Sequence, residues 1–118
     1  MTHLHCNNHK YIDIIQWTFN DILKISDYDL NITFCNLKND LRYNCVGMFR
    51  GPNVIWIDQF LNEKETIITL FHEIRHYYQY LTKMFDFCKY SYDISWEMDA
   101  IKFSINTYLE YKKEISLK

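Results

Sequence analysis

The feature that most constrains the fold is the segment 62–84, in which apolar residues recur at the spacing of an α-helix. Asn62 stands at its start and Glu65 follows three residues later, which is the pattern of an N-terminal capping box. We expect one face of this helix to pack on the protein core and the opposite, polar face to line a cleft. The apolar stripe consists of Ile67, Leu70, Phe71, Ile74, Tyr78 and Leu81.

The segments around this helix predict an α+β fold. Apolar residues at helical spacing also occupy 11–25 and 94–111, which predicts an N-terminal and a C-terminal helix. Between the first two helices, 31–37, 43–49 and 53–58 are rich in β-branched and aromatic residues, as strands are. Because short connections separate them, we expect a small, three-stranded, mostly antiparallel sheet.

The length, charge and cysteine content of the chain narrow its class. The 118 residues can bury one hydrophobic core, so we expect 1–118 to form a single domain. A net charge of −2 argues against a nucleic-acid partner or an anionic membrane surface. No stretch approaches the roughly 20 apolar residues of a membrane span. The chain also has no signal-peptide pattern and no Cys-x-x-Cys pair, so we expect a cytoplasmic protein with reduced thiols.

The N-terminal stretch "HLHCNNH" is a first possible metal-binding cluster. It contains His3, His5, Cys6 and His9. Their spacings match no standard zinc motif. We therefore expect residues 1–9 to be a flexible start of the chain.

The stretch "HEIRH", on the long helix, is a second possible metal site. His72 and His76 lie one helical turn apart on the polar face, so both imidazoles can point at one tetrahedral ion. Glu73, beside them, can reach a metal-activated water as a general base. A solvated helix face with ordinary polar residues would show the same letters, and this alternative stays open on the motif alone.

A catalytic zinc site normally has three protein ligands and one open position, so a third ligand is needed. No histidine follows His76, which leaves the upstream histidines and the downstream carboxylates. Glu97 shares a stripe of the C-terminal helix with apolar residues, where an unpaired carboxylate would be costly. The alternative is a partly exposed Glu97 in an ion pair with Arg75 or Lys102.

Two stretches carry a resemblance to a known family. "TLFHEIRHYYQ", followed after a short gap by "WEMDAIKFS", resembles the pattern His-Glu-x-x-His … Glu-x-(Glu/Asp)-Ala-x-x-(Phe) of gluzincin-type zinc peptidases. Within that group it is most similar to the small ImmA/IrrE-like metallopeptidases of bacteria and phages and to the single-domain minigluzincins. The resemblance covers about 53–103 and implies a zincin-like fold, in which the C-terminal helix carries the third ligand.

The resemblance also implies roles for five residues. His72, His76 and Glu97 would bind Zn²⁺, and Glu73 would be the general base. Asp99 would support one of the ligand histidines from behind, as carboxylates around metal sites do.

The resemblance implies that the chain is a small cytoplasmic zinc metallopeptidase. Its expected substrate is a specific regulatory protein, in which it would hydrolyse peptide bonds. A zinc-activated water would attack the scissile carbonyl, and the peptide would add as a strand to 53–58 or its neighbour. The alternative is a catalytically inactive, peptidase-like binding or regulatory module that grips a protein partner with the same fold. A third hypothesis is a small α+β protein without a metal.

Overall fold

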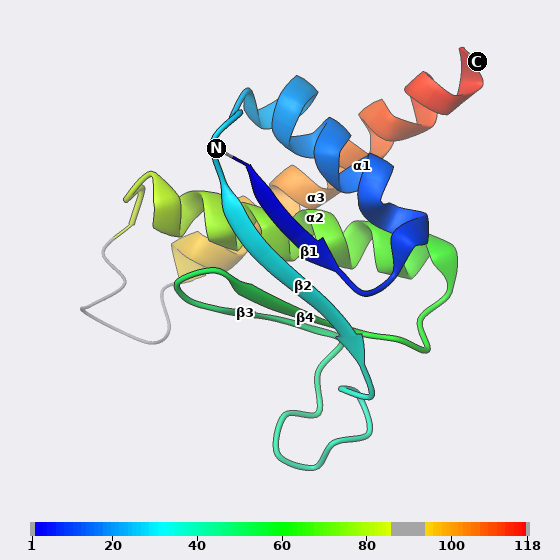
Figure 1. Ribbon diagram of the computed structural model, residues 1–118, viewed down its shortest axis with the longest axis vertical. Helices are drawn as coiled ribbons and strands as arrows, with labels where there is room; N and C mark the ends of the chain where they lie inside the picture. The colour runs from blue at the N-terminus through cyan, green and yellow to red at the C-terminus, as the bar shows by residue number, and fades with distance from the viewer. Residues whose placement is uncertain (1, 86–93, 118) are drawn as a thin grey trace.

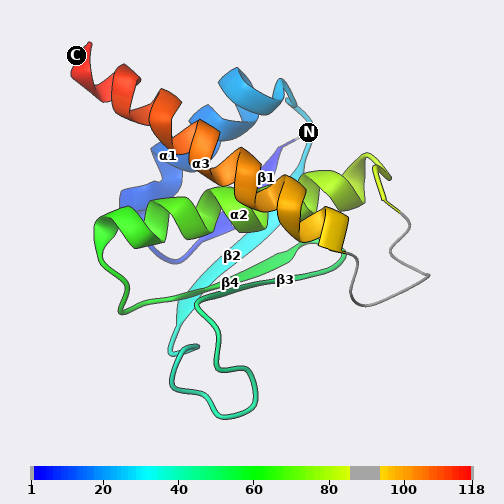
Figure 2. The same ribbon diagram turned by 180° about the vertical axis from the view of Figure 1, so that it is seen from behind.

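The structure is a computed structural model that describes residues 2–85 and 94–117. A four-stranded sheet carries helix α2 on one face, and helix α3 crosses α2 on the side away from the sheet (Figures 1 and 2). Within the described residues, no helix is both long and apolar enough to span a membrane. The expected α+β class is confirmed.

Helix α2 (Glu63–Leu81) forms as its sequence predicts. Asn62 caps it, because the Asn62 Oδ1 accepts a hydrogen bond of 2.8 Å from the Glu65 N–H. Most of the apolar stripe packs into the core, where Leu70 and Ile74 are completely buried, whereas Leu81 at its end is exposed. A helix fixed so firmly by its apolar face holds the side chains of its other face in place.

The sheet differs from the one expected. Its strands are β1 (His3–Cys6), β2 (Asp29–Cys35), β3 (Gly47–Arg50) and β4 (Val54–Asp58), in the spatial order β1-β2-β4-β3. β1 pairs with β2 in parallel, β2 pairs with β4 in parallel, and only β3 and β4 are antiparallel. The predicted three-stranded, mostly antiparallel sheet is therefore wrong in strand number and in direction.

The connection between β2 and β3 explains the mixed sheet. β3 begins at Gly47 rather than at residue 43, so the connection 36–46 is longer than the sequence suggested. Buried Asp58 holds the first residues of this connection in place. Its Oδ1 accepts hydrogen bonds from the Leu37 and Lys38 N–H groups at 3.1 and 3.0 Å. This length carries the chain past the position of β4, so β3 forms the outer edge of the sheet.

Near the N-terminus, His3–Cys6 form strand β1, whereas the sequence led us to expect a flexible start over residues 1–9. The side chain of Asn7 extends the pairing of β1 with β2: its amide donates to the Phe34 carbonyl at 3.0 Å and accepts from the Phe34 N–H at 2.7 Å. The histidines of "HLHC" alternate with Leu4 and Cys6, which is the period of a strand with one exposed face. No potential metal-ligand group within residues 2–85 and 94–117 includes these N-terminal histidines.

The first helical segment connects β1 to β2. It consists of a 3-10 turn (His9–Tyr11), the α-helix α1 (Ile12–Trp17) and a π-helical stretch (Thr18–Leu23). It ends at Lys24, whose backbone is left-handed with a φ of 58°. Ile15 and Phe19 are buried in the core beside α2, so the predicted amphipathic character of 11–25 is confirmed.

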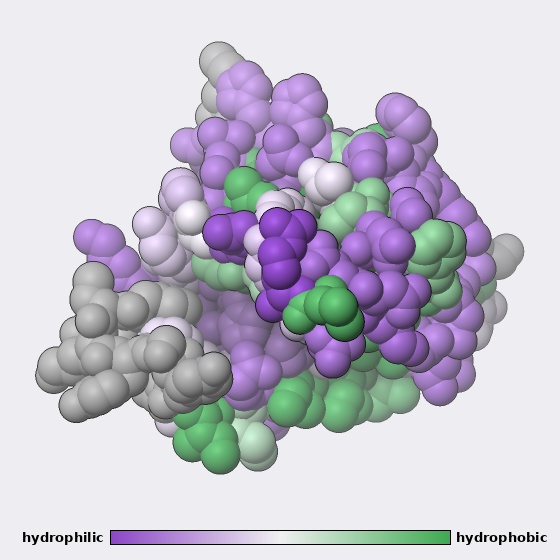
Figure 3. Space-filling view, turned by 90° about the horizontal axis from the view of Figure 1, so that it is seen from below, coloured by the Kyte–Doolittle hydropathy of each residue, from purple (hydrophilic) through white to green (hydrophobic). Residues whose placement is uncertain are grey.

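Helix α3 (Ile94–Ser116) is longer than the predicted 94–111, and it packs on α2 through small side chains. Its buried residues are Ala100, Ser104 and Thr107, and the only alanine of the chain is completely buried there. The opposite side exposes a row of aliphatic side chains, and hydrophobic residues gather along the lower margin of the view in Figure 3. The exposed row consists of Ile94, Met98, Ile101, Ile105 and Leu109.

Candidate metal centre

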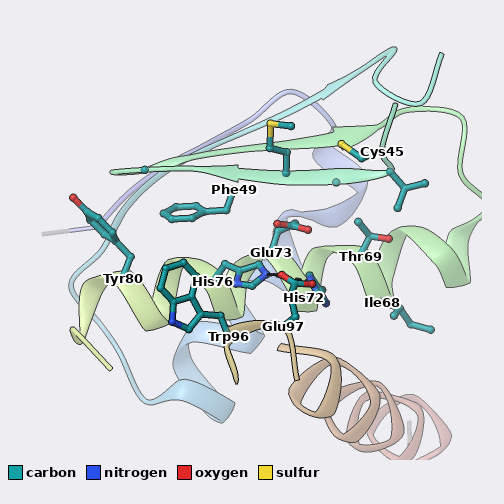
Figure 4. A pocket seen from close by; sticks show the side chains of 14 residues that line it. Cys45, Phe49, Ile68, Thr69, His72, Glu73, His76, Tyr80, Trp96 and Glu97 are labelled. Carbon is teal, nitrogen blue, oxygen red and sulfur yellow. Dashed lines mark hydrogen bonds and ion pairs between the residues drawn. The ribbon is translucent and has the colours of Figure 1, made fainter. Parts of the chain in front are cut away.

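Two histidines of α2 and one glutamate of α3 meet at the mouth of a cleft (Figure 4). The Nε2 atoms of His72 and His76 are 3.2 Å apart. The Glu97 Oε2 lies 3.3 Å from the His72 Nε2, and the Glu97 Oε1 lies 2.7 Å from the His76 Nε2. The structure thus brings together the three residues that the sequence indicates as ligands.

These separations fit a tetrahedral metal ion. Zinc–ligand distances of about 2.0–2.1 Å with tetrahedral angles place the ligand atoms about 3.3 Å from one another. The His72–His76 and His72–Glu97 distances match this value. The shorter His76–Glu97 distance can open by a small rotation of Glu97, whose side chain is 57% exposed. Two imidazoles and one carboxylate are also a donor set that divalent metals accept in proteins.

Burial on α2 favours the neutral, metal-binding form of the His72 imidazole. Burial lowers the pKa of His72 below its ordinary value, and the neighbouring His76 lowers it further, whereas Glu97 acts in the opposite direction. A neutral imidazole has a lone pair for a metal, and a protonated one does not.

Gln79 fixes the orientation of His76, a role that the sequence did not suggest. The Gln79 amide nitrogen donates to the Trp96 carbonyl at 3.0 Å and to the Asp99 carboxylate at 2.8 Å. Because both of these partners are acceptors, the amide oxygen must face His76, 2.9 Å from its Nδ1. The Gln79 oxygen thus favours a proton on Nδ1, and Nε2 is the ring atom that faces Glu97 and would be available to a metal. The one available signal was that Gln79 follows His76 by three residues on the same helix face.

Asp99 is connected to His76 indirectly, through Gln79. Its carboxylate accepts two hydrogen bonds from Arg75, at 2.7 and 3.2 Å, and one from Gln79, which in turn contacts His76. The Arg75 guanidinium holds the pKa of Asp99 below its ordinary value, against the effect of burial. Arg75, which the sequence offered as an ion-pair partner of Glu97, thus pairs with Asp99 and ties α2 to α3.

Glu73 is a buried carboxylate, 6% exposed, that points from α2 toward β3 (Figure 4). Burial raises its pKa to about 8, and the charge of Glu97 adds to this, while a hydrogen bond from the Phe49 N–H acts against it. A buried carboxylate is unfavourable as an anion unless a cation lies nearby, and otherwise its protonated form is favoured. A divalent ion at the three residues would supply such a cation, so the position of Glu73 is compatible with a metal site.

Gly47 allows β3 to approach α2 closely beside Glu73. A Cβ atom on Gly47 would lie 2.5 Å from the Thr69 Cγ2 and 3.1 Å from the Glu73 Cγ. Because Cβ atoms almost never come this close to another atom, a side chain at position 47 would force Thr69 or β3 to shift. β3, α2 and the first turn of α3 together enclose a cleft of about 820 Å³.

No protein-family model matches this chain, and no curated protein or solved structure matches it significantly. The interpretation of the site therefore depends on its own residues and geometry.

Proposed function

We propose that this chain is a zinc-dependent metallopeptidase of the gluzincin type, which hydrolyses peptide bonds in the cleft between β3 and α2. The observation that carries the proposal is the convergence of His72, His76 and Glu97, with separations of 2.7 to 3.3 Å, beside buried Glu73. A solvated polar face would place these groups in water rather than against one another.

The residues of the cleft divide the chemistry among them. His72, His76 and Glu97 would hold the ion, and zinc bound by such ligands acts as a Lewis acid that activates water for attack on a carbonyl. Glu73 takes up the proton released by that attack and passes it to the leaving amine. Its burial beside the three ligand residues holds the carboxylate in place to pass a proton between two partners.

The peptide would lie along β3, because β3 is an edge strand and forms one wall of the cleft. The Val46 carbonyl accepts a hydrogen bond of 2.9 Å from the Asp58 N–H, so this residue faces β4. By alternation, the main-chain groups of Gly47 and Phe49 point away from β4, and the Phe49 N–H donates there to Glu73. The strand 53–58 lies inside the sheet, which leaves its neighbour β3 as the docking strand. We further propose that the substrate is one regulatory protein of the cytoplasm, since general proteolysis there would be harmful.

Replacing Glu73 by Gln tests the proposed function. The Glu73→Gln protein should keep about one zinc per chain and lose cleavage of a mixed peptide library by about 10²–10⁴-fold, because the proton acceptor is gone. Product peptides are identified by mass spectrometry. Glu65→Gln, an exposed position about two turns earlier on the same helix, is the matched control and should cleave as the wild type does.

Two results would contradict the proposal in different ways. Cleavage by Glu73→Gln at the wild-type rate would refute the role of Glu73. A wild-type protein that holds one zinc and cleaves no peptide would favour the inactive binding module.

A further inference from the structure

The cleft has a direction that the contacts of β3 define. At one end, Gly47 lies over Thr69 and Glu73 of α2, as the Cβ contacts show. At the other end, a Cβ atom on Gly51 would lie 3.5 Å from the ring of Tyr80. β3 therefore runs in the same direction as α2. A peptide that pairs with β3 in antiparallel fashion must begin at the Tyr80 end and finish at the Thr69 end.

The two ends of the cleft differ in their side chains (Figure 4). Phe49, Tyr80 and Trp96 gather at one end, and the Phe49 and Tyr80 rings lie 5.8 Å apart in a tilted arrangement. Trp96 directly precedes the ligand Glu97, so this aromatic cluster begins next to the metal position. The opposite end is formed by aliphatic and hydroxyl-bearing side chains, among them Ile68 and Thr69.

Three rings of this kind form a surface that suits a large apolar side chain. Phe49 stands on β3, Tyr80 on the last turn of α2 and Trp96 on the first turn of α3, so three elements contribute one ring each. Tyr80 is 41% exposed and thus accessible from the cleft. Aromatic groups bind each other through tilted and edge-to-face contacts that add to the effect of burial.

We propose that Phe49, Tyr80 and Trp96 form the subsite for an aromatic or large aliphatic residue on the N-terminal side of the scissile bond. This inference rests on the proposed function and names its substrate class: proteins with such a residue within about two positions before the cleavage site. The aliphatic and hydroxyl-bearing side chains near Thr69 then face the residues that follow the scissile bond.

Binding of two small probes to the zinc-loaded protein tests the subsite without cleavage. N-acetyl-phenylalanine hydroxamate and N-acetyl-alanine hydroxamate each place a metal-binding group directly after one residue, so their side chains occupy the N-terminal side. The phenylalanine probe should bind about tenfold more tightly by calorimetry, because its ring contacts the aromatic cluster.

Variants of the cluster should remove this preference selectively. Tyr80→Ala should reduce the tenfold preference to about two- to threefold, and its matched control Tyr80→Phe, which keeps the ring, should retain it. Trp96→Ala should have the same effect as Tyr80→Ala. Because Tyr80 is partly exposed, its replacement leaves the fold intact even where loss of the Trp96 ring does not.

The outcomes separate this inference from the proposed function. Equal binding of the two probes, or a preference that survives in Tyr80→Ala, overturns the subsite and leaves the peptidase proposal standing. A phenylalanine preference in a protein that cleaves no peptide supports the subsite and overturns the peptidase. If neither hydroxamate binds the zinc-loaded protein, both proposals fail.

Discussion

The two helices that supply the three candidate ligands hold these side chains with different rigidity. On α2, the side chains of His72 and His76 are only 20% and 11% exposed, and Phe71 and Ile74 beside them are buried in the core. On α3, Glu97 stands in the first turn and its side chain is 57% exposed. The packing of α2 in the core therefore fixes the positions of the two histidines. The position of the Glu97 carboxylate depends only on how the N-terminal end of α3 packs against α2.

This difference shows how the site is assembled. The spacing of the histidines follows from a single helix, so it exists wherever α2 exists. The position of Glu97 depends on the contact between α2 and α3, which is fixed by buried Ala100 and by the hydrogen bonds of Asp99 with Arg75 and Gln79. Substitutions on α2 should therefore destabilise the packed core around the histidines. Substitutions on α3 should instead displace Glu97 alone from the site.

Among residues that are not themselves candidate ligands, Gln79 should have the largest effect, because it links the two sides. Gln79→Leu keeps the volume and the burial but removes the hydrogen bonds to His76, the Trp96 carbonyl and Asp99. We expect the zinc dissociation constant to rise by about 100-fold, measured by competition with a chelator. Gln16→Leu, on the exposed face of α1, is the control and should leave the affinity unchanged. An unchanged affinity in Gln79→Leu would mean that the α2 pair needs no such support.

A smaller effect should come from one methyl group at the closest approach of β3 to α2. Gly47→Ala forces its Cβ against Thr69 and Glu73, so we expect the free energy of unfolding to fall by about 1–3 kcal/mol in urea titrations. Gly51→Ala is the matched control, because its nearest neighbour would lie at an ordinary 3.5 Å and the change should stay within about 0.5 kcal/mol. If the free energy of unfolding changed equally in Gly47→Ala and Gly51→Ala, the contact of β3 with α2 would not be as rigid as we infer.

What the sequence predicted well was local. The cap at Asn62, the apolar stripe of α2 and the convergence of His72 and His76 all follow from residues within a few turns of one another. The sheet order could not be predicted in the same way, because it depends on how far the connection 36–46 carries the chain. β1 was missed because its two histidines made an alternating strand look like a polar, irregular start.

Glu97 was indicated by an argument that holds only in part. The sequence placed it on a core-facing stripe with Ile94, Ile101, Ser104 and Tyr108. Ser104 is buried and Tyr108 is partly buried, but Ile94 and Ile101 are 76% and 43% exposed. The buried side of α3 is instead lined by small residues such as Ala100. The connection of Asp99 to His76 through Gln79 was also beyond the sequence, because it joins two helices whose relative placement is a tertiary property.

We propose that three side chains from two helices, His72, His76 and Glu97, form one zinc site. The most direct measurement is elemental analysis of the purified, untagged protein beside its Glu97→Ala variant. We predict about one zinc per chain in the wild type and loss of that zinc in the variant, because two histidines alone hold zinc weakly. No metal in the wild type after reconstitution with zinc, or equal zinc in both proteins, would contradict the account.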